Sequence, residues 1–192
     1  MKNVLKNYLQ KLAHAGTGLE FISIHCRYGK FTIYCLVGPE ENIIHLAFTA
    51  PKHDRAQKQL AALDDRIFFK TVQQEDFSRN KLFNDYFSGK QSNMPIEINS
   101  PFIDAGSGFQ QRVWQHISAI PYGETITYQR LAELAGSPKG ARAAGTACGA
   151  NPLPIIIPCH RVVANNSIGG FGGGIPLKKS LLALEKEGSR KK

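Results

Sequence analysis

The sequence predicts an α/β protein of two domains, and three observations lead to this class. The 192 residues suffice for one large domain or two small ones. Residues 19–48 have the pattern of short strands, whereas the second half has the period of helices. A polar segment bounded by Gly89 and Pro95 separates these halves, so we expect domains at residues 1–95 and 96–192.

The first domain is expected to be built around a small antiparallel sheet. Three strand-like runs are separated by glycine-containing turns; they are Leu19–Cys26, Lys30–Val37 and Asn42–Phe48. A short helix with Leu5, Leu9 and Leu12 on one face precedes them, and helices at Asp54–Leu63 and Arg79–Phe87 follow. The histidines of this half have no ligand spacing, and we interpret them as structural.

The second domain is predicted to be mostly helical. Helices are expected at Phe109–Ile120, at Tyr128–Ala135 and at about Lys139–Ala150, and the last two flank a Gly-Ser-Pro turn in the outline of a helix-turn-helix. The third of these helices consists largely of alanine and glycine from residue 141 to 150, and Arg142 is the one long side chain of that stretch. Such a surface fits close packing against another helix or close approach to nucleic acid, and these residues alone favour neither interpretation.

Composition narrows the classes of partner and compartment. The net charge of +9 favours a polyanion such as nucleic acid or an anionic membrane surface, although a basic protein with neither partner fits as well. Glycines and prolines interrupt the longest uncharged stretch, Ala143–Cys159, so no membrane span is expected. The 4 cysteines form no C-x-x-C pair, which gives zinc or redox motifs no support and favours a reducing, cytosolic-type compartment.

The residues around Cys159 carry the strongest chemical signal. They follow Ile155–Ile157, which we predict to be a short buried strand. The thiolate is the reactive form of cysteine, and the adjacent His160 can take the thiol proton directly or through a water. Glu185, on the last predicted helix, is the leading candidate to orient His160. The alternative is a buried inert thiol, and the basic neighbours favour the nucleophile.

A loop rich in asparagine and glycine follows at residues 164–174. Its backbone N–H groups would be accessible to a phosphate or a carbonyl oxygen. Phe171 lies in this loop, and a flexible linker would rarely carry an aromatic residue there.

Together these motifs resemble the O6-alkylguanine-DNA alkyltransferases, also called methylated-DNA–protein-cysteine methyltransferases. The matching pieces keep the family's order over residues 102–188; they are Gly108-Phe109-Gln110, Val113-Trp114, Ile120–Thr125, Thr127-Tyr128, Leu131-Ala132, Ala141–Ala143, Asn151-Pro152, the run ending Pro158–Val162, Lys178, Leu181-Leu182 and Glu185. The Pro-Cys-His-Arg-Val run is highly specific within this framework. The first domain resembles the family only loosely. The resemblance implies a ribonuclease H-like first domain and a winged helix-turn-helix in the second.

The resemblance also implies a reaction. The alkyl group would move from O6 of guanine in DNA to Cys159, irreversibly and once per molecule, while activity on O4-alkylthymine is left open. His160 would be the base, acting through a water and held by Glu185. Asn151 would fix the turn beneath the site, and Tyr128 would donate to the guanine or protonate it. Base flipping is required because O6 lies inside the base-pair edge.

For DNA binding, the resemblance implies that Arg142 fills the stack left by the flipped nucleotide, with its helix in the minor groove. The backbone carbonyls of Cys159 and Val162 would accept hydrogen bonds from the exocyclic amine of guanine. Further residues expected at the substrate or DNA are Ala141, Thr127, Phe171, Gly172 and Lys178. Phe171 stands where the family commonly has tyrosine. We therefore expect a monomer without cofactor or metal, acting on double-stranded DNA that contains O6-alkylguanine, with no membrane partner and a cytoplasmic, DNA-associated location.

Three other functions are compared with this hypothesis. A damage-binding relative without transfer activity would lack the acceptor, and Cys159 argues against it. A thiol hydrolase could use the same cysteine and histidine, but it would need an oxyanion hole and would turn over many times. A transcription regulator would read bases through polar side chains, whereas the second helix of the predicted helix-turn-helix offers mainly alanine and glycine.

Overall fold

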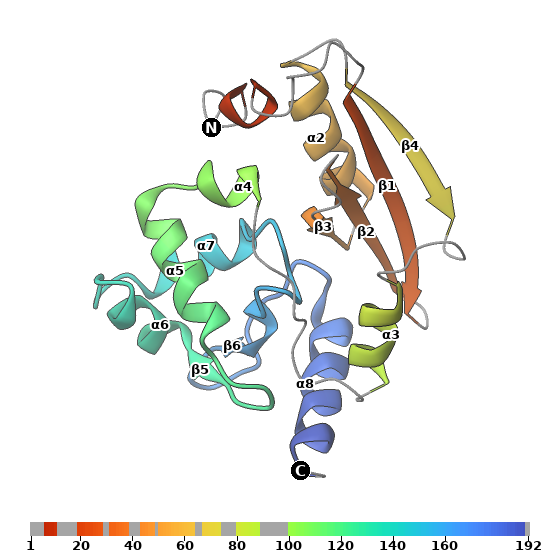
Figure 1. Cartoon of the computed structure of the whole chain (residues 1–192). Coiled ribbons are helices and arrows are strands. Elements are labelled where there is room, and N and C mark those ends of the chain that lie inside the picture. The colour runs from red at the N-terminus through yellow and green to blue at the C-terminus, as the bar shows by residue number, and fades with distance from the viewer. Residues whose placement is uncertain are drawn as a thin grey trace. The chain divides into compact units, whose positions relative to one another are not determined.

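The computed structural model describes residues 6–10, 19–28, 31–38, 43–48, 50–63, 67–73, 80–88 and 100–190 (Figure 1). By their contacts, residues 1–80 and 97–106 form one compact unit, and residues 81–96 and 107–192 form a second. Residues 81–95 thus group with the second unit, although the sequence analysis assigns them to the first domain. The domain boundary at residue 95 stays a prediction.

A four-stranded sheet with the order β3-β2-β1-β4 lies at the centre of the first unit. β1 (Leu19–Tyr28) pairs antiparallel with β2 (Phe31–Val37), and β2 pairs antiparallel with β3 (Ile43–Ala47), which agrees with the predicted strands. β4 (Ile67–Gln73) pairs parallel with β1. The expectation of a wholly antiparallel sheet is therefore wrong: a fourth strand, which the sequence analysis did not predict, makes the sheet mixed.

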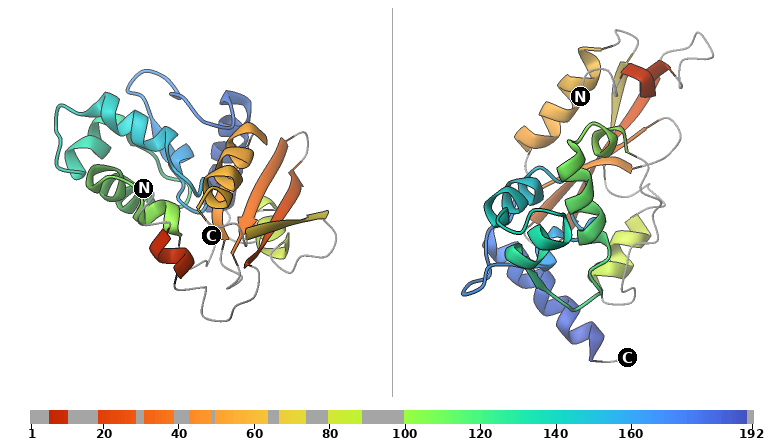
Figure 2. Two further views of the ribbon diagram at one scale, coloured as in Figure 1. Left: turned by 90° about the horizontal axis from the view of Figure 1, so that it is seen from above. Right: turned by 90° about the vertical axis from the view of Figure 1, so that its left-hand side faces the viewer.

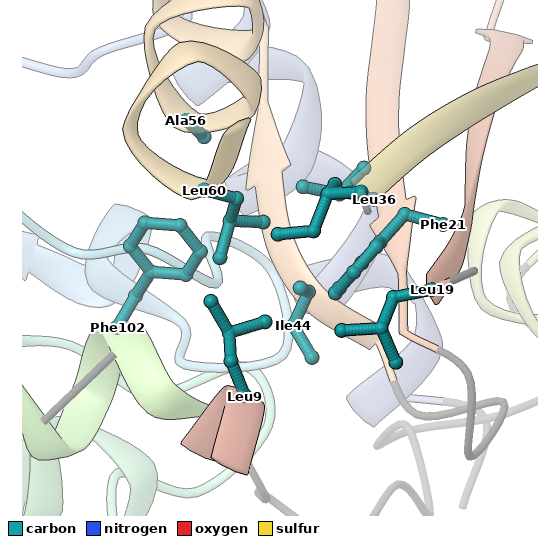
Figure 3. Packing of buried hydrophobic residues seen from close by; sticks show 9 residues of the cluster. Leu9, Leu19, Phe21, Leu36, Ile44, Ala56, Leu60 and Phe102 are labelled. Carbon is teal, nitrogen blue, oxygen red and sulfur yellow. The ribbon is translucent and has the colours of Figure 1, made fainter. Parts of the chain in front are cut away.

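The helix α2 (Ala50–Ala61) contacts β2, β3 and β4 and lies along the sheet (Figure 2). It carries the chain from β3 toward β4, and parallel pairing needs such a long connection. Between helix and sheet lies an apolar core (Figure 3), formed by Leu9, Leu19, Phe21, Leu36, Ile44, Ala56, Leu60, Ile67 and Phe102. Leu9 lies in the helical residues 6–10, whereas its predicted partners Leu5 and Leu12 lie outside the described residues.

Two histidines of this unit are buried among structural contacts. The Nε2 atom of His53 lies 2.8 Å from the hydroxyl of Ser23, and the ring of His45 packs edge-on against Phe102 of α4 (Pro101–Asp104). Burial, followed by the nearby His53 and Lys52, lowers the pKa of His45 to about 3. Both side chains therefore act as packing residues of the first unit.

The second unit is mainly helical, as predicted. Its longer helices are α5 (Gly108–Ser118), α6 (Tyr128–Leu134), α7 (Ala141–Gly149) and α8 (Ile175–Ser189), and α3 (Asn80–Phe87) precedes them in the chain. The helices α5, α6 and α7 pack on one another. The short strands β5 (Ile126–Thr127) and β6 (Val162–Val163) pair in parallel.

Local signals set the ends of these helices. Ser107 and Gln110 form a reciprocal capping box at the start of α5, and the hydroxyl of Thr127 accepts a 3.0 Å hydrogen bond from the N–H of Arg130 at the start of α6. After α6, Gly136 adopts a φ of 77°, which turns the chain toward α7. Within the described residues, no helix is both long and apolar enough to cross a membrane.

One local prediction of the second unit is wrong. Residues Ile155–Ile157 form a turn rather than a short strand, and Ile155 has a φ of 79°, in the left-handed region. The physical reason lies in the flanking residues. Pro154 and Pro158 offer no N–H, and the side chain of Asn151 instead bonds the backbone on both sides of the turn.

We expect Leu60→Ala to destabilise the first unit. Leu60 is fully buried, so truncation should lower the free energy of unfolding by about 2–5 kcal/mol through lost burial and the cavity left behind. Urea unfolding followed by circular dichroism measures this loss. Lys58→Ala, at an exposed position of the same helix, should stay within about 0.5 kcal/mol of the wild type. Equal stability of both variants would contradict the described core.

Candidate active site

Cys159 begins a short 3-10 helix (Cys159–Arg161) directly after the turn. Cys159 carries a free thiol, and the residue is 6% exposed. The N–H of Cys159 donates to the carbonyl of Ile157 at 2.7 Å, and the amide of Asn151 donates to the same carbonyl at 2.8 Å. The Asn151 side chain also accepts from the N–H of Leu153 at 3.0 Å. Asn151 thus holds the turn that presents Cys159.

The carboxylate of Glu185 lies at the centre of a buried polar cluster and is fully buried. Its Oε1 lies 2.8 Å from Nε2 of His160, and it accepts from Nη2 of Arg161 at 2.9 Å and from the hydroxyl of Tyr86 at 2.5 Å. Its Oε2 accepts from Nε of Arg161 at 2.8 Å and from the N–H of Gly123 at 3.1 Å. The structure therefore joins Glu185 to His160 as the sequence suggested, and adds three further partners.

These contacts set the charges of the site. Burial alone would raise the pKa of Glu185, but hydrogen bonds from His160 and Arg161, with their charges, outweigh it and lower the pKa to about 2. Burial lowers the pKa of His160, and the bond to Glu185 opposes this only in part. Glu185 is thus ionised and His160 neutral at neutral pH.

The two ring nitrogens of His160 have different surroundings. Nε2 faces Glu185, and an ionised carboxylate can only accept, so the ring proton resides on Nε2. Nδ1 is buried and has no hydrogen-bond partner within the described residues. A neutral imidazole in this tautomer leaves Nδ1 as the atom able to accept a proton.

A cavity of about 300 Å³ opens beside Cys159. Its walls are two aromatic side chains, two thiol-bearing residues and the backbone of four glycines; they are Tyr128, Phe171, Cys148, Cys159, Gly145, Gly149, Gly170 and Gly172. The ring of Phe171 also meets that of His160 edge-on, with centroids 6.2 Å apart. The size and aromatic lining suit a flat ring system.

Both remaining titratable groups of the wall stay protonated. Burial, followed by the neighbouring thiols, raises the pKa of Tyr128 to about 12, and its hydroxyl donates to the carbonyl of Gly170 at 3.2 Å. Burial also raises the pKa of Cys148, which therefore remains a thiol. Tyr128 therefore keeps its hydroxyl proton, and Cys148 is a neutral thiol at the cavity wall.

Lys178 occupies a position that differs from its expected one. The side chain is fully buried, and its ammonium group donates to the carbonyl of Val162 at 2.6 Å and to that of Gly170 at 3.0 Å. It also lies 5.8 Å from the centre of the Tyr128 ring. A direct contact with a DNA phosphate is therefore excluded in this conformation. Lys178 instead connects the glycine-rich loop to the strand after Cys159.

The helix α7 has one packed and one exposed face. Ala144 and Ala147 are buried, and the indole N–H of Trp114 donates to the carbonyl of Ala147 at 2.9 Å. Arg142 is exposed, and Ala141 is half-buried beside it. The small residues therefore serve close helix packing on one side and leave Arg142 projecting into solvent on the other. Arg142, Ala141 and Thr127 do not line the cavity.

The sequence analysis missed two side-chain partners of Glu185. Arg161 stood in the quoted motif but was considered only as a positive neighbour of the thiol. Tyr86 lies 99 positions before Glu185, and nothing in its local spacing marks it. Within the described ranges, no three His, Cys, Asp or Glu side chains gather as a metal site would need, and the absence of a metal stays a prediction.

Comparisons with known proteins identify the relatives of this chain. The family model for the 6-O-methylguanine DNA methyltransferase DNA-binding domain matches residues 108–187. The methylated-DNA–protein-cysteine methyltransferase of Methanosarcina acetivorans is 35% identical over 153 residues, which cover 78% of this chain and 89% of the relative. The chain belongs to the methylated-DNA–protein-cysteine methyltransferase family.

Other members of this family show how far the likeness extends. The methylated-DNA–protein-cysteine methyltransferase of Mycolicibacterium paratuberculosis is 47% identical over 105 residues, 54% of this chain and 61% of the relative, so the match spans about three-fifths of that protein. The crystal structure of Mycobacterium tuberculosis O6-methylguanine methyltransferase superimposes with a TM-score of 0.71 at 30% identity, covering 87% of this chain and 93% of the other. The two-domain α/β organisation is thus common to both.

We expect the second unit to lose stability on acidification. Because the folded-state pKa of His160 is lowered, the unfolded chain binds a proton below about pH 6.5 that the folded chain does not. The lowered pKa of Glu185 adds a second loss of folding stability as the pH falls from 4.5 toward about 2. Urea unfolding followed by the fluorescence of Trp114, the single tryptophan, measures both. His160→Asn should flatten the dependence between pH 7 and 5, and an unchanged slope would contradict the assignment.

Proposed function

We propose that this protein repairs alkylated DNA by transferring the alkyl group from O6 of guanine to Cys159, once per molecule. The observation that carries the proposal is the position of Cys159 at the wall of the cavity, next in sequence to a neutral histidine whose Nε2 is tied to the buried Glu185. Family membership supports the same chemistry. The expected partner is double-stranded DNA containing O6-alkylguanine, and the protein would act as a monomer in the cytoplasm.

The chemistry follows from the protonation states of the site. The thiol of Cys159 gives its proton, through a water, to Nδ1 of His160, and Glu185 stabilises the imidazolium that forms. The thiolate then attacks the alkyl carbon, so an S–C bond forms and the C–O6 bond breaks. Tyr128, whose hydroxyl stays protonated because its pKa is raised to about 12, would donate a hydrogen bond to the departing guanine or protonate it. If it protonates the guanine, the phenolate would recover the proton from the imidazolium, so the thiol proton finally resides on guanine. The thioether that remains ends the reaction.

The DNA would be engaged through the exposed side of α7. The exposed Arg142 would enter the stack as the damaged base leaves it, and the small side chains beside it would allow close approach to the groove. The carbonyl of Cys159 already accepts from the N–H of Val162, and that of Val162 accepts from Lys178. Each carbonyl has a second lone pair, which would receive the exocyclic amine of guanine.

The finer classification of the fold belongs to the same proposal. The mixed sheet with a parallel β1–β4 pair supports a ribonuclease H-like first domain. The helices α6 and α7, which lie in the chain between the paired strands β5 and β6, support a winged helix-turn-helix in the second.

The test of the function is the mass of the intact protein after incubation with duplex DNA containing O6-methylguanine. One methyl group per chain, mapped to Cys159 by peptide analysis, is the expected result, and Cys159→Ser should gain none. Product release far beyond one equivalent would instead indicate the thiol hydrolase. Binding without any transfer would indicate the damage-binding alternative.

Arg142→Ala should separate DNA engagement from chemistry. Unstacking a base costs a few kcal/mol, so loss of the side chain that fills the gap should slow repair in duplex DNA roughly tenfold to a hundredfold. Reaction with the free base O6-benzylguanine should be unaffected. Single-turnover rates on both substrates provide the measurement, and Lys186→Ala, which removes the same charge from an exposed position of α8, is the control. An equal loss on both substrates would assign Arg142 to the chemistry or the fold.

Glu185→Gln should impair both transfer and folding. Losing a charge-assisted hydrogen bond of about 1.5–3 kcal/mol slows transfer roughly tenfold to a hundredfold, and the defect should shrink as the pH rises and hydroxide replaces the base. The variant also leaves Arg161 buried without its partner, which should cost about 3–5 kcal/mol of stability. Transfer rates between pH 6 and 9 and urea unfolding measure the two effects. The exposed Glu187→Gln should match the wild type, and an active, stable Glu185→Gln would exclude the relay.

A further inference from the structure

The helix α3 (Figure 1) lies outside the segment that carries the sequence motifs. Its Tyr86 side chain reaches the buried cluster. This side chain is 1% exposed. Its hydroxyl donates to Oε1 of Glu185 at 2.5 Å and lies 3.4 Å from Nε2 of His160. The tyrosine thus approaches the same carboxylate oxygen that holds the histidine.

The partners of the two carboxylate oxygens of Glu185 are distributed unevenly. Oε1 has three donors, which come from Tyr86, His160 and Arg161, whereas Oε2 has two. Donors that share one oxygen compete for its electron density. The bond between Glu185 and His160 is therefore weaker with the tyrosine hydroxyl present than it would be without it.

The ring of Tyr86 is held in place by its neighbours. It meets the ring of Phe87 at 5.3 Å and that of Tyr122 at 6.3 Å, both edge-on, and Tyr122 in turn lies 5.6 Å from the guanidinium of Arg161. Burial, followed by the charge of Glu185, raises the pKa of Tyr86 well above its usual value of 10, so the hydroxyl stays protonated and acts as a donor. The charged and titratable groups that face this cluster are Glu185 and Lys178 of α8, Arg161, His160 and Tyr122.

We propose that Tyr86 is a positioning residue whose hydroxyl limits how strongly Glu185 holds the proton on His160. This inference rests on the proposed function of the same site. By sharing Oε1, Tyr86 keeps the imidazole neutral and Nδ1 available before the thiol proton arrives. It also ties α3 to the catalytic histidine, so a residue far from the Pro-Cys-His-Arg-Val run tunes the reaction.

Tyr86→Phe tests the inference, because it removes one hydroxyl and keeps the ring. Without the competing donor, Glu185 should bind the His160 proton more tightly. At low pH the transfer rate falls because His160 is protonated. In Tyr86→Phe this acid limb of the single-turnover pH profile should move to higher pH by about half a unit to one unit, which is a threefold to tenfold loss of rate on that limb. At high pH the rate should equal or exceed that of the wild type.

Tyr122→Phe is the matched control. It removes the same atom from the adjoining ring, whose hydroxyl lies beside Gly188. This variant should leave the acid limb in place. A Tyr86→Phe profile that is lowered equally at every pH, or not altered at all, would overturn the inference, since a purely structural role changes stability without moving the limb.

A second substitution guards against a folding defect. 3-Fluorotyrosine at position 86 has a more acidic hydroxyl and is a stronger hydrogen-bond donor. The acid limb should therefore move to lower pH, opposite to the shift in Tyr86→Phe. The NMR resonance of the His160 Nε2 proton should move downfield in Tyr86→Phe and upfield in the fluorinated protein. The NMR measurement needs no transfer activity, so the two proposals fail separately. Absence of methylation on the wild-type Cys159 refutes the proposed function. An unmoved Nε2 proton resonance refutes the role of Tyr86.

Discussion

A single buried charge organises the second unit. The carboxylate of Glu185 has no exposure to water, and an isolated ion in that position would be strongly unfavourable. Within the described part of the chain, its five donors belong to four residues from three separate segments: α3, the turn before β5, and the segment that begins at Cys159. Compensating this charge therefore requires those segments to meet on α8. The position of the histidine next to the thiol is a consequence of the same requirement.

The same charge determines what the histidine can do. An acceptor at Nε2 fixes the ring proton on that side and leaves Nδ1 unprotonated. Arg161 balances the carboxylate by two hydrogen bonds, so Glu185 remains ionised even though it is buried. Burial of His160 keeps the imidazole neutral until a proton arrives, and the carboxylate then stabilises the imidazolium. Folding and thiol activation thus depend on one set of contacts.

Local patterns predicted much of this arrangement. The helical period and the Gly-Ser-Pro turn predicted α5, α6 and α7, and Glu185 on the last predicted helix was the leading candidate to orient His160. The parallel strand β4 was missed because strand pairing is a tertiary effect. The turn at Ile155–Ile157 was missed because the apolar run was given more weight than the flanking prolines and the local hydrogen bonds of Asn151. The resemblance assigned Lys178 to the substrate or DNA, and its burial, compensated by two carbonyls, became visible only in the structure. Tyr86 had no signal, since its role arises only from folding.

The tautomer of His160 tests the central claim most directly. Long-range ¹H–¹⁵N correlation spectra of the unmodified protein at neutral pH distinguish a protonated ring nitrogen from an unprotonated one. If Glu185 organises the site, Nε2 carries the proton and Nδ1 is unprotonated, and the Nε2 proton resonates far downfield because of the charged acceptor. A proton on Nδ1, or a ring that is fully protonated at neutral pH, would contradict the account.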